Sequence, residues 1–181
     1  MFDYDKKVLD VFFAKRNELI DKLENDELNK KNFLLENYLL IENLNMKPFQ
    51  VLNSIEKCMY NYQYYNVMAK YYRVKINNAL NTKKQRKSTE VNKSKISNYY
   101  IEKDKVILEL LKIVDKENII SYPVIINSSR INNLIEIVIL NYERAILHSI
   151  NDEVVEILKS KGVYDSTPRL SKIDNYVNSG Y

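Results

Sequence analysis

The amino-acid sequence of this 181-residue chain predicts an α+β fold. Apolar residues recur at helical spacing over residues 1–115, which indicates amphipathic helices. From residue 116 onward, runs rich in β-branched residues alternate with turn-forming residues, which favours a small antiparallel sheet. We therefore expect a single domain, residues 1–181, in which a helical part is followed by the sheet and two further helices (116–181).

The N-terminal third predicts two helices joined by a short connection. The first covers residues 5–24, where Leu9, Phe12 and Ile20 share one face. The second runs through Phe33 and Ile41 and has to end before Pro48, because the residue before a proline is steered away from the α region. Such a pair forms an αα-hairpin.

A long helix is predicted from residue 49 to residue 80, and it is apolar on two sides. One side contains Cys58 and Tyr65, and the other contains Tyr60, Tyr64 and Tyr71. Either this helix lies between two layers of its own chain, or one side is free for a partner. A polar, exposed connection is expected at residues 82–97, and a fourth helix at residues 98–115.

The predicted sheet has three antiparallel strands, at residues 119–126, 134–140 and 144–148. Pro123 cannot donate a ladder hydrogen bond and would place the first strand at an edge. The alternative is one long helix over residues 133–150. Two helices follow: one from about residue 151 to Lys161, closed by Gly162, and a short one that starts at Thr167 and Pro168.

The scarcity of certain residue types excludes several kinds of site. With one cysteine the chain can form no internal disulfide, and with one histidine as well it lacks the ligands of a Cys/His zinc site. Two glycines are too few for a P-loop or a dinucleotide-binding loop. No apolar run is long enough to span a membrane, and the start of the chain does not resemble a signal peptide. We expect a cytoplasmic protein that needs no metal and no cofactor.

No catalytic group stands out, and we expect that the protein is not an enzyme. Cys58 lies on the core side of the long helix, where a free cysteine behaves as a small hydrophobic residue, and His148 closes a predicted strand. The acidic residues Asp152, Glu153 and Glu156 begin a predicted helix, where they complement the helix dipole.

Positive charge is concentrated in the middle of the chain. Residues 49–100 carry 10 basic and 2 acidic side chains, whereas residues 1–48 carry 8 and 10, and residues 101–181 carry 10 and 12. Clustered positive charge attracts polyanions. An abundance of Lys, Asn, Ile and Tyr reflects AT-rich codons, however, so the number of lysines alone carries little weight.

These observations favour a protein that binds another macromolecule, most simply through protein–protein contacts and as a homodimer. The partner-binding residues would be Tyr60, Tyr64 and Tyr71. The alternative is a nucleic-acid-binding protein that uses the basic, tyrosine-rich segment 57–87, in which aromatic rings stand beside positive charge. Its phosphate-binding residues would be Lys83, Lys84, Arg86 and Lys87.

Two stretches carry a resemblance to a known family. They are KPFQVLNSIEKCMYNYQYYNVMAKYYR, residues 47–73, and the C-terminal LIEIVILNYERAILHS with the later EILKSKGVYD and IDNYVNSGY. The sequence resembles short, uncharacterised cytosolic proteins of clostridial-type, low-GC Gram-positive bacteria. The resemblance covers nearly the whole chain and implies no activity, cofactor or functional residue.

Overall fold

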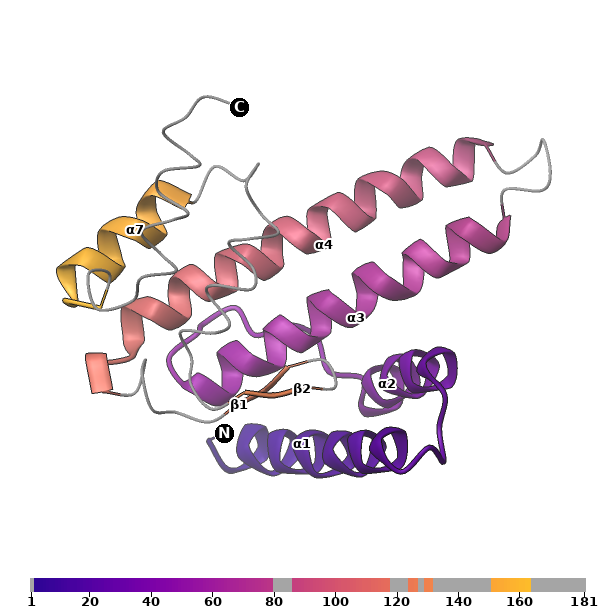
Figure 1. Cartoon of the computed structure of the whole chain (residues 1–181), viewed down its shortest axis with the longest axis horizontal. Helices are drawn as coiled ribbons and strands as arrows, with labels where there is room; N and C mark the ends of the chain where they lie inside the picture. Colours follow the sequence, from indigo (N-terminus) through magenta and orange to yellow (C-terminus); the bar gives the residue numbers. More distant parts are fainter. Residues whose placement is uncertain (1, 80–85, 118–123, 127–128, 132–150, 164–181) are drawn as a thin grey trace. The chain divides into compact units, whose positions relative to one another are not determined.

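The computed structural model describes residues 2–79, 86–117, 124–126, 129–131 and 151–163 (Figure 1). These residues form five helices, labelled α1, α2, α3, α4 and α7, and one pair of three-residue strands. The predicted α+β fold with a three-stranded sheet is therefore wrong, because helices dominate the part of the chain that is described.

The chain divides into two compact units. The first contains Met1–Val51 and Met59–Lys103, and the second contains Leu52–Cys58 and Asp104–Tyr181. The boundaries between the two units fall inside helices α3 and α4. Each of these helices therefore contributes residues to both units.

Helices α1 (Phe2–Glu24) and α2 (Lys30–Leu44) confirm the predicted hairpin, and they lie side by side (Figure 1). Asn29 caps the start of α2, because its Oδ1 accepts a hydrogen bond of 2.9 Å from the backbone N–H of Asn32. Asn45 ends α2 in the left-handed conformation, at φ 47°. Leu9, Phe12 and Ile20 are buried, as their spacing predicts.

Helix α3 (Ile55–Ala79) begins six residues later than predicted. The start follows Ser54, whose Oγ accepts a hydrogen bond of 3.3 Å from the N–H of Lys57, so Ser54 is the N-cap. The segment before it is fixed by Asn61. The Asn61 side chain accepts from the N–H of Phe49 at 2.8 Å and donates to the carbonyl of Phe49 at 2.9 Å.

Helix α4 (Arg86–Ile113) is much longer than the predicted helix at residues 98–115. The expectation of a polar connection at residues 82–97 is wrong for residues 86–97, which are helical. Extending an existing helix costs far less than starting one, so good helix formers such as Lys, Arg and Glu can continue it without a full apolar face. Burial of Thr89 and partial burial of Ile96 support this extension.

The strands β1 (Val124–Ile126) and β2 (Ser129–Ile131) pair antiparallel, with Val124 opposite Ile131. The sequence predicts that residues 119–126 pair with residues 134–140 and places residues 129–131 in the turn between them. Enrichment in β-branched residues indicates an extended segment but does not select its partner, and a nearby segment pairs at a lower entropic cost. The predicted strand at residues 144–148, Pro123 and the alternative helix at residues 133–150 lie outside the described residues.

Helix α7 (Asn151–Ser160) in the second unit confirms the helix predicted there. Gly162 follows it at φ 66°, and the N–H of Val163 donates to the carbonyl of Leu158 at 3.0 Å, which is a Schellman closure. Lys161 Nζ donates to the carbonyls of Lys112, at 3.4 Å, and Val114, at the end of α4. The predicted helix at Thr167 and Pro168 lies outside the described residues.

Candidate macromolecule-binding surface

Tyr60, the first residue of the predicted partner-binding set, is completely buried inside the first unit. Its ring packs edge-on against Phe12 of α1, with centroids 4.9 Å apart, and against Phe49, with centroids 5.5 Å apart. Its hydroxyl donates to the carbonyl of Met46 at 2.9 Å. Tyr60 therefore belongs to the core, together with Leu9, Leu40, Ile41, Val67 and Met68.

Tyr71 is half-buried and lies flat against Tyr38 of α2. The two ring centroids are 3.7 Å apart and the ring planes differ by 3°. Tyr64, also half-buried, contacts Tyr60 on one side and Tyr65 on the other, with centroid distances of 6.2 and 5.4 Å. The second apolar side of α3 could be covered by the chain itself or left free for a partner. At Tyr60 and Tyr71 it is covered by the N-terminal hairpin of the chain itself.

The opposite side of α3 faces α4 within the same unit. Tyr99 of α4 stacks on Tyr72 at 6.0 Å and lies 6.3 Å from Tyr65. The rings from Tyr38 to Tyr60 thus form one continuous network, which we call the tyrosine network. Its members on α2, α3 and α4 are Tyr38, Tyr60, Tyr64, Tyr65, Tyr71, Tyr72 and Tyr99.

Burial keeps four half-buried members of the tyrosine network uncharged at neutral pH. Burial raises the pKa of Tyr64 from 10.0 to about 12, and nearby Tyr99 and Glu42 act in the same direction. Burial also raises the pKa of Tyr38, Tyr65 and Tyr99 above 10. These four rings therefore contribute apolar surface and hydroxyl donors, and they carry no negative charge that would repel an anion.

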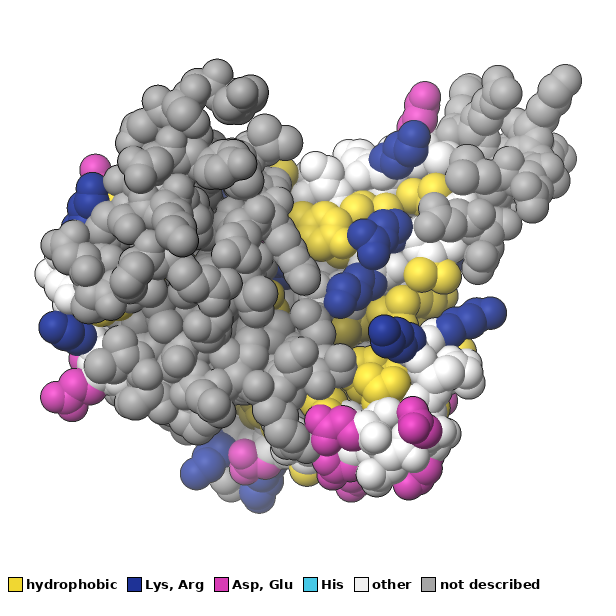
Figure 2. All heavy atoms as spheres, in the orientation of Figure 1, with side chains coloured by type: hydrophobic (Ala, Val, Ile, Leu, Met, Phe, Trp, Pro, Cys, Tyr) yellow, Lys and Arg dark blue, Asp and Glu magenta, His cyan; other side chains and the backbone are white. Residues whose placement is uncertain are grey.

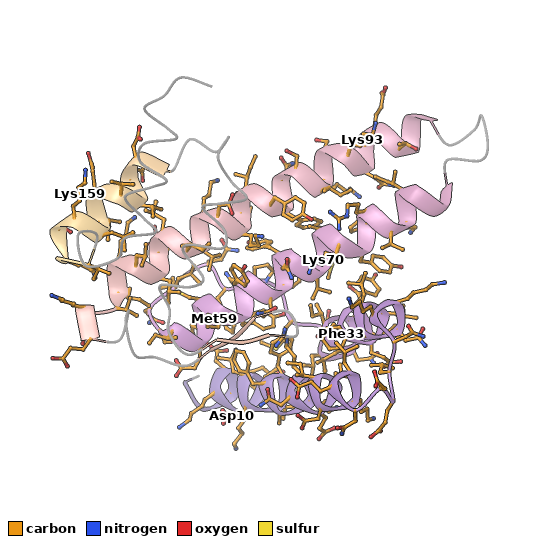
Figure 3. All side chains as sticks on the ribbon, viewed as in Figure 1. Asp10, Phe33, Met59, Lys70, Lys93 and Lys159 are labelled. Atoms are coloured by element: carbon orange, nitrogen blue, oxygen red, sulfur yellow. The ribbon has the colours of Figure 1, made fainter. Side chains whose placement is uncertain are left out.

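Cationic side chains flank this network on α3 and α4. Lys95 Nζ lies 5.4 Å from the centroid of Tyr72, and Lys75 Nζ lies 6.0 Å from that of Tyr71. Arg73 and Lys93 are exposed on the same two helices. In Figure 2, Lys and Arg side chains alternate with hydrophobic ones where α3 and α4 run side by side, and Figure 3 marks Lys70 and Lys93 on these helices. We call this region the basic tyrosine face, with members Tyr71, Tyr72, Lys75, Lys95 and Tyr99.

The basic residues singled out from the sequence lie at the start of α4 or just before it. Arg86 and Lys87 form its first turn, which contains no acidic residue. Lys83 and Lys84 lie outside the described residues. The N-terminal end of a helix carries a partial positive charge, and no acidic residue in the first turn of α4 offsets it.

Two buried cationic side chains, Arg16 and Lys103, were not predicted from the sequence. Arg16 of α1 is 3% exposed, and burial lowers its pKa to about 10 despite the favourable influence of Tyr62. Lys103 of α4 is also buried, with its Nζ 5.5 Å from the centroid of Tyr62 and 5.1 Å from that of Tyr100. The position of Arg16 midway between the core residues Phe12 and Ile20 was the available signal, because residues four apart share a helix face.

The groups considered for catalysis occupy structural positions where they are described. Cys58 is fully buried, and burial raises the pKa of its thiol to about 12, with a smaller effect from Glu109. Asp152 and Glu153 are exposed in the first turn of α7. His148 lies outside the described residues. Among the residues that the structure describes, no three His, Cys, Asp or Glu side chains are placed to hold a metal ion.

Within the described ranges, no helix has the length and apolar character that a membrane span requires.

Comparison with known proteins places the chain in a family to which no activity is assigned. None of the curated proteins and none of the solved structures matches the chain. A family model described as "Family of unknown function (DUF6648)" matches residues 2–181, and this nearly complete match shows that the chain belongs to the DUF6648 family.

Proposed function

We propose that the protein is a non-enzymatic, cytoplasmic nucleic-acid-binding protein of clostridial-type bacteria and that single-stranded nucleic acid binds to the basic tyrosine face. The observation that carries the proposal is the placement of exposed cations beside half-buried tyrosine rings on two adjacent helices. This placement is seen in two pairs, in which Lys95 lies over the ring of Tyr72 and Lys75 lies over the ring of Tyr71. Phosphates and bases are the chemical groups that such a surface complements.

Charge supports the polyanion part of this proposal. On the described parts of α3 and α4 up to residue 100, the side chains of Arg73, Lys75, Lys93 and Lys95 are exposed and those of Lys57 and Lys70 are half-buried, whereas the acidic side chains there are Glu56 and Glu90. A uniform excess of lysine from codon bias would have raised the charge of α1 and α2 equally. Those helices instead lie in the stretch of residues 1–48, which has more acidic than basic side chains.

The ring contacts support a single strand over a duplex. A lysine that lies over a ring can move to a neighbouring phosphate when a base takes its place on the ring. Lys95 and Tyr72 form such a pair, and stacking of a base on an aromatic ring contributes about 1–3 kcal/mol. A duplex keeps its bases stacked on one another, so it would gain only the charge contacts.

A salt titration tests the proposal on the full chain. We expect the anisotropy of a labelled single-stranded oligonucleotide to rise with protein concentration at low salt. The double variant Lys75→Glu/Lys95→Glu should bind more weakly and should reduce the slope of log Kobs against log salt by about 1.4, because each phosphate contact on a single strand contributes about 0.7. The matched control is Lys30→Glu/Lys31→Glu, which changes the net charge equally at exposed positions of α2.

Absence of binding at low salt, or equal weakening by the control, would refute the use of this face. Tighter binding of a duplex than of a single strand of the same length would refute the stacking part alone. Both outcomes are read from the same titration, and circular dichroism of each variant shows whether the helices are retained.

A second candidate function, protein–protein contact in a homodimer, is supported by a different surface. Leu35 and Leu39 lie one turn apart on α2 and are 44% and 38% exposed. Two exposed leucines on one helix face are typical of a helix that packs against a partner. If the chain is a dimer through α2, light scattering should give twice the monomer mass, and Leu35→Glu/Leu39→Glu should restore the monomer. Tyr60 cannot take part while the first unit stays folded, because it is completely buried.

A further inference from the structure

The contact between Tyr38 and Tyr71 differs from the other ring contacts of the tyrosine network. The planes of the two rings are parallel to within 3° and their centroids are 3.7 Å apart, so the two rings are stacked face to face in van der Waals contact. The pair joins α2 to α3. Both side chains are half-buried, so both remain accessible to water and to small solutes.

Stacked aromatic pairs usually prefer an offset or edge-to-face arrangement, because the faces of two rings repel each other electrostatically. Other pairs in the network follow this rule, with interplanar angles of 88° for Tyr64 and Tyr65 and 80° for Tyr71 and Tyr72. The exception places the ring carbons of two phenols in direct contact. A phenoxyl radical carries much of its unpaired electron on the ring carbons next to the hydroxyl, so this overlap is the arrangement from which two such radicals couple.

We propose that Tyr38 and Tyr71 form an oxidative modification site, at which an intramolecular dityrosine bond joins α2 to α3. The co-reactant is a diffusible one-electron oxidant such as the hydroxyl radical, two equivalents of which are consumed. Each phenol loses one electron to the oxidant and its hydroxyl proton to water, which gives two tyrosyl radicals. The radicals form one carbon–carbon bond between ring positions next to the hydroxyls. Each bonded carbon then gives up its hydrogen as its ring regains aromaticity and its hydroxyl, so two hydrogen atoms are lost overall.

Other tyrosines of the network are less suited to this reaction. Tyr60 is completely buried and its hydroxyl donates to the carbonyl of Met46, which cannot take up the proton that oxidation releases. Tyr72 and Tyr99 are close to parallel, at 22°, but their centroids are 6.0 Å apart. A radical formed at Tyr72 can take an electron from Tyr71, whose centroid is 5.7 Å away, and so pass the oxidation to the proposed pair.

The test uses the full chain and a photochemically generated one-electron oxidant, tris(bipyridine)ruthenium(III), at low protein concentration. We expect a monomeric product with dityrosine fluorescence, a mass lower by two hydrogen atoms, and a cross-linked peptide pair that contains Tyr38 and Tyr71. Tyr71→Phe and Tyr38→Phe each keep the ring but remove the phenol, and each should lose most of the monomeric signal. The matched control Tyr99→Phe removes a phenol from the same network and should keep it.

A cross-link mapped mainly to other tyrosines, a product formed mainly between two molecules, or a full monomeric signal in both Tyr38→Phe and Tyr71→Phe would overturn the proposal. Because the two variants lie on different helices, disruption of one helix in one variant does not decide the result. The proposal is independent of nucleic-acid binding, and oxidation in the absence of any oligonucleotide tests it by itself.

Discussion

The side chain of Asn61 provides the sharpest test of how the first unit is held together. Its amide pairs with both backbone groups of Phe49, at 2.8 and 2.9 Å, in the way that one strand pairs with another. Asn61 is 2% exposed, and Phe49 packs against Tyr60 in the core. One amide on α3 therefore fixes the chain segment that leads into this helix.

We expect Asn61→Leu to lower the free energy of unfolding by about 2–4 kcal/mol. Each hydrogen bond contributes about 1 kcal/mol net, and the N–H and carbonyl of Phe49 would lose their partners in a partly buried place, which adds a similar amount. Asn61→Asp has almost the same shape, but it replaces the donor to the Phe49 carbonyl by an oxygen. It should be at least as damaging, and increasingly so as the pH rises and the carboxyl ionises.

Urea unfolding followed by circular dichroism measures both variants. The matched control is Asn53→Leu, which lies in the same segment at an exposed position and should stay within about 0.5 kcal/mol of the unmodified protein. A loss of less than about 1 kcal/mol in Asn61→Leu would show that core packing, and not the amide pair, fixes this segment.

Three further predictions concern other described groups. The Cys58 thiol is fully buried and its pKa is raised to about 12, so at pH 8 its reaction with a disulfide reagent should be limited by the rate at which the folded protein opens. Rapid reaction of the folded protein would contradict this. The stability difference between the unmodified protein and Tyr64→Phe should be the same at pH 7 and pH 8 and should shift against the unmodified protein between pH 10 and 12, because Tyr64 ionises near 10 when unfolded and near 12 when folded; an equal difference between the two proteins in urea titrations at pH 8 and 11 would disprove it. Lys161→Met should lower stability by about 1 kcal/mol, because the ammonium that binds the last carbonyls of α4 is lost, and hydrogen exchange of α7 should accelerate more than that of α1.

Helical periodicity predicted the parts of the fold in which one face of a helix is buried. Helices α1, α2 and α7 occur where they were expected, because residues such as Phe12, Ile41 and Leu158 repeat at the spacing of a buried stripe. Position 162 was also predictable, since glycine is the residue that most easily adopts a positive φ after a helix.

The errors share a physical origin in contacts between residues distant in sequence. The first turns of α4 have no clear apolar stripe, and a helix there depends on continuation from the buried segment around Leu110. The strand pairing depended on the choice between two partners, which composition does not encode. The tyrosine-rich second side of α3 was correctly identified as apolar, but the sequence could not reveal that Phe12 and Tyr38 would cover it.

The backbone conformation at the ends of the N-terminal helices has an evolutionary consequence. Asp26 and Asn45 both have positive φ, of 59° and 47°, at positions where many proteins place glycine. Apart from glycine, asparagine and aspartate are the residues that tolerate this conformation best, and the codons of asparagine are AT-rich whereas those of glycine are GC-rich. Mutational pressure on the genome can thus replace a glycine by asparagine at a helix end without loss of the fold. A relative from a GC-richer genome is expected to have glycine at position 45 and to keep the same hairpin.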